Sequence, residues 1–264
     1  MTKSKVRSLV FKICCYIFLG LVLIFVLAPI MATILFSFNS GRFATLPLRG
    51  FTLDWYKQAL SNEDILLSLK NSVLIGLTSS AISAALGFMA SYGLRHWESK
   101  MKNVFTLFSL SAMAIPWTIL GLALLIYFKG IGVHLSNVTV CISHVVFTCP
   151  LALTTINARM QTIPMSYEDA AHDLGAGSIR TLLFVMLPQA FPAILSAMLL
   201  CFTLSFDEFI ISWFVCGFDT TLPVYLYNVI RAGAKPTVNA IGSVVFGISI
   251  LFGVISQLLV RKKK

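Results

Sequence analysis

Two adjacent acidic residues, Asp207 and Glu208, interrupt a long apolar run at about residues 192–215. An acidic side chain at the centre of a membrane-spanning helix costs about 2.5–3.5 kcal/mol, so both carboxylates need water, polar partners or a functional role. A carboxylate near aromatic rings such as Trp213 attracts ammonium groups, which also bind the ring faces through cation–π contacts. The pair is therefore a candidate cation site, and the alternative is a polar network at a subunit interface.

Only one of the two carboxylates is expected to face a path along which a cation could cross the membrane. Successive residues of a helix point about 100° apart, so the other carboxylate would meet a neighbouring helix or a partner subunit. The sequence alone leaves both assignments open, and we favour Asp207 for the path.

The polar segment at about residues 157–191 carries helix start and stop signals. Ser166 is a good N-cap, and Asp169 three residues later can help to satisfy the free amides of a helix start. Gly175 suits the left-handed conformation that ends a helix, and Ser178 can cap a second, apolar helix. The segment is therefore predicted to form a helix-turn-helix.

The composition places these features in a membrane protein. Of the 264 residues, 58% are hydrophobic and only 11% are charged, and the mean hydropathy is +0.88, far above that of soluble domains. The fold class is therefore all-α, with six transmembrane helices in a single transmembrane domain covering residues 1–264. The expected spans are residues 10–36, 71–94, 104–128, 137–156, 192–215 and 238–260.

The net charge of +10 orients the chain in the membrane. Lys and Arg residues stand at the ends of the apolar runs without an aromatic-interleaved stripe, which argues against nucleic-acid binding. Thirteen of the 20 basic residues fall on the side of the N-terminus when six spans are drawn. The positive-inside rule then places both termini and the 157–191 segment in the cytoplasm.

Two further patterns predict local structure. Aromatic residues at 51–60, between the first two spans, indicate a short interfacial helix that anchors the outer loop. In the second span, Ser79, Ser83, Gly87 and Ser91 recur every four residues, which produces a strip where another helix can approach closely. We expect this strip to serve packing, and the alternative is a surface that slides during gating.

Several kinds of chemistry find no support in the sequence. The six cysteines lack the paired spacing of a zinc site, the four histidines show no metal-ligand spacing, and no metal is expected. The chain contains neither a G-x-x-x-x-G-K-[ST] phosphate loop nor the H-E-x-x-H and G-x-S-x-G motifs of hydrolases. It is therefore expected to be no enzyme, and His144, inside a span, is expected to be a hydrogen-bonded packing residue.

A signature in the 157–191 segment resembles the EAA motif of ABC importer permeases. The matching residues are Asp169, Ala170, Ala171, Gly175, Leu187 and Pro188. Only the first position departs from the family pattern, because Asp169 replaces glutamate and shortens the reach of the carboxylate. The resemblance implies a type I importer fold in which this segment is the coupling loop that docks in a groove of the ATPase.

The resemblance also implies partners. These are a homologous second permease, a cytoplasmic ABC ATPase dimer that binds ATP and Mg, a periplasmic or lipid-anchored solute-binding protein, and the lipids of the bacterial inner membrane. The chain itself would hold no cofactor. A purely structural membrane protein would explain the spans but neither the motif nor the intramembrane acids.

Further stretches resemble the polyamine branch of this family, which carries spermidine and putrescine. They include Trp55 and Tyr56 in the outer loop, Asn71 and Ser72 at the second span, and His144. Trp117 departs from that branch, whose members often have an acidic residue there, so another cationic or small organic solute is the alternative. The expected path residues are Asp207, Glu208, Trp117 and Trp213.

Overall fold

The computed structural model describes residues 3–41, 45, 47–97, 99–233 and 236–261. These residues form helices, with one isolated antiparallel bridge between Asn39 and Phe51. They group into two compact units, Met1–Asn62 with Val229–Gly247 and Glu63–Asn228 with Ile248–Lys264.

The first unit begins with the long helix α1, Lys3–Ser37, followed by α2, Asp54–Ser61. Helix α2 is tied to the end of α1 and the residues just after it, because Tyr56 Oη lies 2.6 Å from Ser37 Oγ and Trp55 Nε1 donates to the Asn39 carbonyl at 2.7 Å. The first predicted span and the short helix predicted around residues 51–60 are both confirmed as helices.

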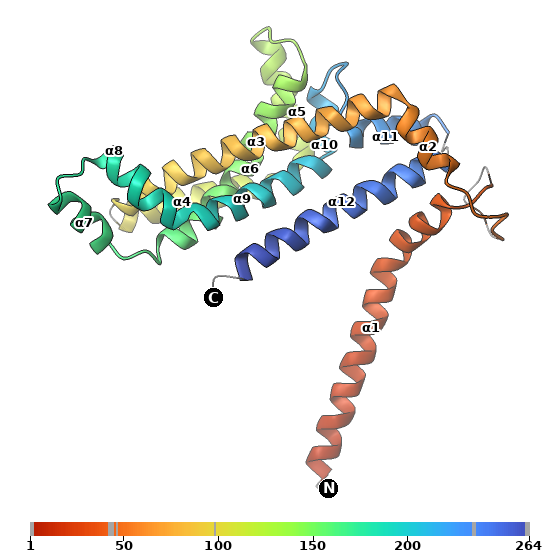
Figure 1. The fold of residues 1–264 in the computed structure, drawn as a ribbon, viewed down its shortest axis with the longest axis horizontal. Coiled ribbons are helices and arrows are strands. Elements are labelled where there is room, and N and C mark those ends of the chain that lie inside the picture. Colours follow the sequence, from red (N-terminus) through yellow and green to blue (C-terminus); the bar gives the residue numbers. More distant parts are fainter. Residues whose placement is uncertain (1–2, 42–44, 46, 98, 234–235, 262–264) are drawn as a thin grey trace. The chain divides into compact units, whose positions relative to one another are not determined.

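Three helices form the core of the second unit: α3, Glu63–Arg95; α6, Asn137–Met160; and α9, Leu187–Asp207 (Figure 1). The small-residue strip of α3 allows a close approach of α6. A Cβ atom on Gly87 would lie 2.8 Å from the backbone nitrogen of Leu153 on α6, and Ser83 Oγ lies 2.7 Å from Thr148 Oγ1. The prediction that this strip is a packing face is confirmed.

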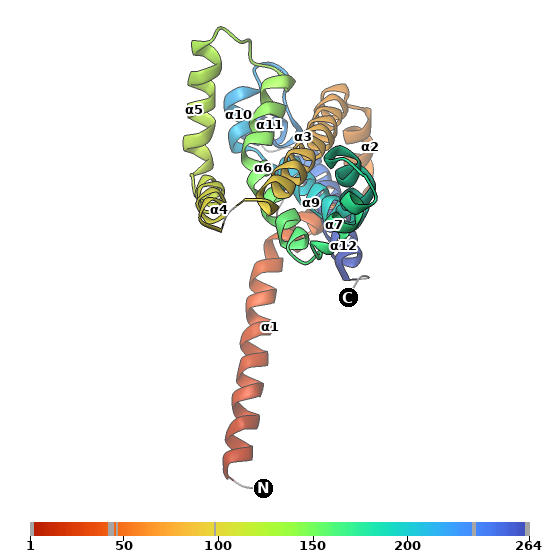
Figure 2. The ribbon, with the colours of Figure 1, turned by 90° about the vertical axis from the view of Figure 1, so that its left-hand side faces the viewer.

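The expected third span, residues 104–128, is wrong as a single helix. The structure has α4, Ser99–Met113, and α5, Trp117–Gly130, separated at Pro116. Pro116 has φ −57° and ψ 129°, and its ring cannot continue the preceding helix because it lacks an N–H and clashes with the turn before it. The break lets α5 pack against α10, Ile210–Val215 (Figure 2).

The expected fifth span is also interrupted. Helix α9 ends at Asp207 and α10 begins at Ile210, because Glu208 is extended with ψ 122°. At its other end, α9 continues from α8, Ser178–Arg180, and the π-helix η1, Thr181–Met186. The second helix of the predicted helix-turn-helix is thus the first part of a continuous helical segment that ends at Asp207.

Two elements complete the chain: α11, Leu222–Arg231, which the sequence pattern did not predict, and α12, Pro236–Arg261. Within the described residues, four helical segments are long and apolar enough to cross a membrane, and Trp117–Gly130 and Pro236–Leu251 are shorter apolar helices. All six predicted apolar runs are therefore helical. The basic residues Lys262–Lys264, used above to orient the chain, lie outside the described part.

Candidate functional site

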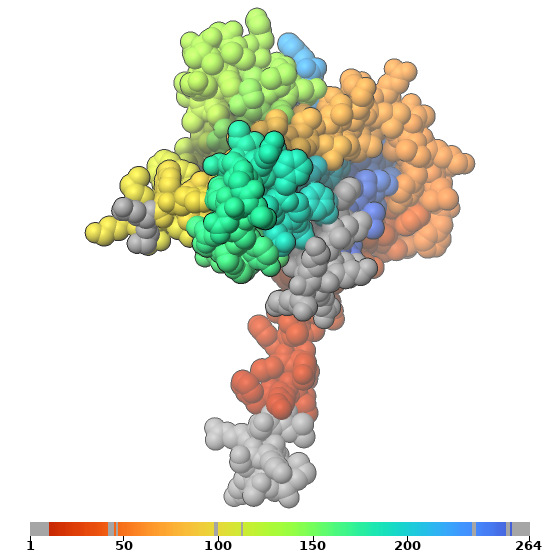
Figure 3. Space-filling model, turned by 60° about the vertical axis from the view of Figure 1, so that its left-hand side comes forward, coloured from red at the N-terminus to blue at the C-terminus, as the bar shows by residue number. Residues whose placement is uncertain are grey.

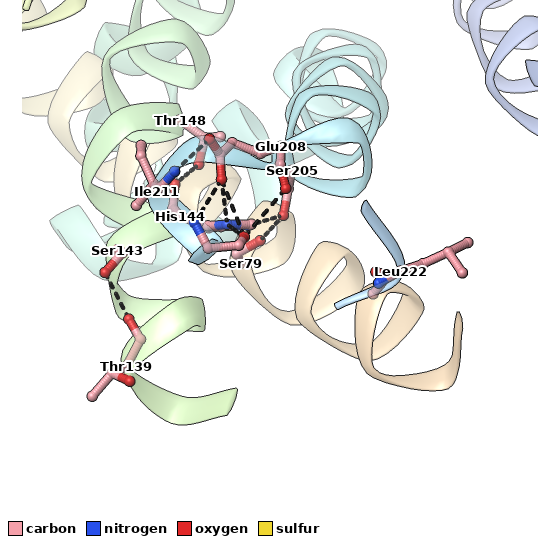
Figure 4. Close-up of polar contacts among 11 residues, drawn as sticks. Ser79, Thr139, Ser143, His144, Thr148, Ser205, Glu208, Ile211 and Leu222 are labelled. Atoms are coloured by element: carbon pink, nitrogen blue, oxygen red, sulfur yellow. Dashed lines mark hydrogen bonds and ion pairs between the residues drawn. The ribbon is translucent and has the colours of Figure 1, made fainter. Parts of the chain in front are cut away.

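Glu208 occupies the break between α9 and α10 and caps the second of these helices. The residue is 2% exposed. Oε1 accepts a hydrogen bond from the N–H of Ile211 at 2.7 Å, and Oε2 accepts one from the N–H of Ser212 at 2.9 Å (Figure 4). These N–H groups belong to the first turn of α10 and have no partner within that helix. The carboxylate thus satisfies the backbone donors that the break exposes.

His144 of α6 joins this break to α9 and α3. Its Nδ1 lies 2.6 Å from Ser205 Oγ, and its Nε2 lies 2.9 Å from Ser212 Oγ and 3.5 Å from Glu208 Oε2. Ser205 Oγ also lies 3.0 Å from Ser79 Oγ of α3 (Figure 4). The expectation that His144 is a hydrogen-bonded packing residue is confirmed.

Asp207 has the opposite environment from Glu208. It is the last residue of α9 and is exposed, and its carboxylate accepts a hydrogen bond from Ser249 Oγ of α12, at 3.1 Å to Oδ1 and 3.2 Å to Oδ2. An exposed carboxylate in a membrane-spanning segment is expected to face water or another subunit, because contact with lipid is costly. The two acids therefore point into different surroundings, as the turn of the helix predicts.

The two candidate tryptophans lie in separate aromatic clusters. The Trp117 ring centroid is 5.9 Å from that of Phe147, which in turn lies 5.3 Å from the imidazole of His144. The Trp213 centroid is 6.4 Å from that of Tyr227. Both tryptophans are partly exposed, and no ring contact joins them within the described part of the chain. Trp117 thus lies on the α5–α6 side of the break and Trp213 on α10.

The motif segment contains a short helix, α7, Ser166–Asp173. Its expected start is wrong in one detail: the N-cap is Met165, no side chain caps the helix, and Ser166 lies inside its first turn. Its end is as expected, because Gly175 has φ +80°. The N–H of Gly175 donates to His172 O and that of Ala176 to Ala171 O, which is the double hydrogen bond of a Schellman turn.

The signature residues divide between the two faces of α7. Asp169 and Ala170 are exposed, whereas Ala171 is buried and packs inward. Farther along, Leu187 is half-buried and Pro188 is exposed at the start of α9. Of the two alanines, only Ala170 is therefore available to a partner.

Glu168, which is 2% exposed, is a buried charge that the sequence pattern did not predict. Its Oε1 pairs with Arg95 Nε at the end of α3, and its Oε2 lies 3.0 Å from His96 Nε2. A signal was present, since a glutamate next to a signature and an Arg–His pair at a span end are complementary in charge. Nothing in the sequence spacing placed these two segments together.

The surface after α7 exposes large apolar side chains. Leu174 is 89% exposed, Ile179 74% and Phe184 76%, and the segment forms the green-to-teal surface in Figure 3. Ile179 and Phe184 belong to Ser178–Asp207, one of the helical segments long and apolar enough to cross a membrane, so their exposure is expected of a membrane helix. Leu174 lies before that segment, so its exposed apolar side chain is available to a partner protein.

The sequence matches the profile of a family described as "Binding-protein-dependent transport system inner membrane component" over residues 83–264. The spermidine/putrescine transport system permease protein PotC of Escherichia coli (strain K12) is 30% identical over 236 residues, 89% of each chain. PotC of Haemophilus influenzae is 29% identical over 246 residues, 93% of this chain and 95% of the relative. The putrescine transport system permease protein PotI of E. coli is 30% identical over 90% of this chain and 87% of its own length.

Solved structures share the fold at lower identity. A chain of a bacterial ABC transporter involved in the import of the acidic polysaccharide alginate matches 100% of this chain and 98% of its own, with a TM-score of 0.71 and 18% identity. A chain of an amino acid ABC transporter matches 80% of this chain and 100% of its own, with a TM-score of 0.58 and 17% identity. The resemblance drawn from the signature is confirmed, and the chain belongs to the family of binding-protein-dependent transport system inner membrane components.

Proposed function

We propose that this inner membrane component is one of two permeases of an ATP-driven importer for spermidine or putrescine. The observation that supports this most directly is the exposed carboxylate of Asp207 at a break in a membrane helix. A flexible polycation gains electrostatic attraction from such a carboxylate. The relatives named for spermidine and putrescine transport support the same substrate class.

The path we infer runs past the exposed side of Asp207. Trp213 lies on α10, just beyond the break, and its partly exposed ring offers a π face to an ammonium group. Trp117 is the second aromatic candidate, on α5. Glu208 supports the path indirectly, because it holds the N-terminus of α10 in place through two backbone hydrogen bonds.

The motif segment is proposed as the contact with the ATPase. Helix α7 presents Asp169 and Ala170 outward, and Leu174 directly after it is also exposed. Closure of an ATPase dimer would move such a docked element as a rigid body. ATP and Mg would be bound by the ATPase, and this chain would contribute none of their ligands.

The remaining partners and the topology follow from the same proposal. A homologous permease would complete the path, and a periplasmic or lipid-anchored binding protein would deliver the solute. One structural neighbour is a bacterial alginate ABC transporter in complex with a substrate-bound periplasmic protein, which illustrates such an assembly. Both termini and the motif segment would lie in the cytoplasm, as the distribution of basic residues predicts.

Uptake of labelled spermidine and putrescine by the reconstituted complex tests this function. The wild type is expected to accumulate one or both amines when ATP is supplied. Asp207→Asn is expected to lower uptake roughly tenfold or more, since about 1.4 kcal/mol of lost attraction changes binding tenfold. The asparagine preserves size, so the yield of assembled complex should stay unchanged.

Two other outcomes of the uptake experiment have different meanings. If the complex imports neither amine although another solute stimulates its ATPase, the importer assignment stands and the polyamine assignment is discarded. If Asp207→Asn instead prevents assembly, the carboxylate belongs to the interface between the permeases.

Gly175→Val is expected to reduce the amount of ATPase that co-purifies with the permease. The φ of +80° is strained for a β-branched residue, by about 1–2 kcal/mol, so the turn after α7 should rearrange. Gly177→Val is the matched control, because Gly177 has φ −71° and, like Gly175, no atom near the position of a Cβ. Equal co-purification with both variants would contradict the assignment of α7 as the docking element.

A further inference from the structure

Glu168 fastens α7 to the ends of two core helices. Its carboxylate is buried between Arg95 and His96, which follow one another at the end of α3. Arg95 is itself largely buried, and its Nη1 donates to the carbonyl of Met160, the last residue of α6. One guanidinium thus links α3, α6 and α7. We call Arg95, His96 and Glu168 the clasp.

Helix α3 is bonded to other elements of its unit along most of its length. Beyond the clasp, Ser91 Oγ donates to Leu153 O at 3.3 Å, and the Ser83–Thr148 and Ser79–Ser205 pairs follow toward the break. At the far end, Ser72 Oγ accepts from the N–H of Leu222 at 2.8 Å. Such contacts fix the register of α3 against α6 and α9, so α3 moves with them rather than sliding past them.

The two sets of contacts form one continuous connection. It begins at Glu168 on α7, passes through the clasp into α3, and reaches Ser205, which hydrogen-bonds His144 beside the break that Glu208 caps. A buried ion pair of this kind is weak evidence for stability, because replacing both partners by apolar residues is often neutral. The role that we infer for this ion pair is to fix the position of α7 relative to α3.

We propose that Glu168 is a positioning residue for transport: the clasp transmits movement of α7 to α3, and through Ser79 and Ser205 to the break next to Asp207. This inference rests on the proposed function, because it takes α7 as the element that docks on the ATPase. It assigns a role to a residue outside the family signature. It also names the contacts through which movement of the docked α7 would reach the substrate path at Asp207.

Glu168→Gln in the reconstituted complex tests the clasp, with Glu63→Gln as the matched control on the exposed opposite end of α3. Three quantities are measured: co-purified ATPase, ATP hydrolysis stimulated by spermidine-loaded binding protein, and spermidine uptake per ATP hydrolysed. Glu168→Gln should keep the ATPase bound but lower uptake per ATP at least tenfold. Glu63→Gln should match the wild type in all three.

Arg95→Lys provides a second, independent variant. Lysine keeps the positive charge beside Glu168, but its single ammonium cannot hold both that carboxylate and the Met160 carbonyl in the geometry of a guanidinium fork. Uptake per ATP should therefore fall by an intermediate factor. A purely structural pair would lower the yield of complex and leave uptake per ATP unchanged in the complex that remains.

The outcomes separate the inference from the function on which it rests. Wild-type uptake per ATP in Glu168→Gln, together with loss of ATPase in Gly175→Val, would overturn the clasp and leave α7 as the docking element. Normal behaviour of both variants would overturn the docking assignment and the clasp with it. Loss of folded permease in both Glu168→Gln and Arg95→Lys would also overturn the clasp, because the pair would then serve folding.

Discussion

Replacing Glu208 by glutamine is expected to destabilise the permease severely, although the two side chains have nearly the same shape. Both carboxylate oxygens accept hydrogen bonds, Oε1 from Ile211 N–H and Oε2 from the N–H and Oγ of Ser212. Glutamine has a single oxygen, so its NH₂ group must face one of these donors. The NH₂ group and the backbone N–H that it faces are then two buried donors without an acceptor, each at a cost of about 1–3 kcal/mol.

Thermal unfolding of the purified complex in detergent measures this effect. The midpoint for Glu208→Gln should fall by about 5–15 °C, given roughly 2–4 °C per kcal/mol for a chain of this size. Asp207→Asn is the control at the adjacent position. Its amide oxygen can still accept the bond from Ser249 Oγ, so its midpoint should stay close to that of the wild type. A stable Glu208→Gln complex that no longer imports would instead place Glu208 in the path.

The contrast between these neighbours shows what the sequence could and could not predict. Helical geometry alone required Asp207 and Glu208 to face different surroundings, and the structure confirms that difference. The sequence could not reveal that the helix ends between these two residues. No proline or glycine lies near Glu208 to predict a break. The break depends on the Glu208 carboxylate, which caps α10, and on His144 from another helix.

The break at Pro116 was more accessible to sequence reasoning. A proline removes one backbone hydrogen bond from any helix, and membrane helices either kink or end there. The choice depends on packing. Here the helix ends, and α5 then packs on α10 where Gly121 lets Phe214 approach, so that a Cβ on Gly121 would lie 2.8 Å from its ring. Such complementarity between distant segments is not visible in a local pattern.

The motif segment also contains one feature that the sequence predicts and one that it does not. Gly175 was predictable, because a left-handed turn has a residue preference that can be recognised in one chain. Glu168 was not, because its partners Arg95 and His96 lie more than seventy positions earlier and become neighbours only when α3 packs against α6. Local conformation was thus accessible from local residues, whereas buried charge pairs required the tertiary contact.

The close approach of α3 and α6 leads to the second large expected effect. Gly87→Leu should prevent recovery of folded permease, because even a Cβ at this position would lie 2.8 Å from Leu153 N and 2.9 Å from Ala152 C. Both obstacles are backbone atoms, which no rotamer change can move. The helices would have to separate, and the hydrogen bonds of Ser83 and Ser91 on either side would break.

Gly93→Leu isolates the steric cause, because a Cβ at Gly93 on the same helix meets no atom within 4 Å. Overpacking a tight contact costs about 1–3 kcal/mol for small insertions and more for a full leucine. Size-exclusion chromatography of the expressed permease should therefore show a monodisperse complex for Gly93→Leu and only aggregate for Gly87→Leu. Equal yields would mean that α3 and α6 tolerate separation at Gly87. That result would contradict the fixed register of α3 against α6 on which the clasp proposal depends.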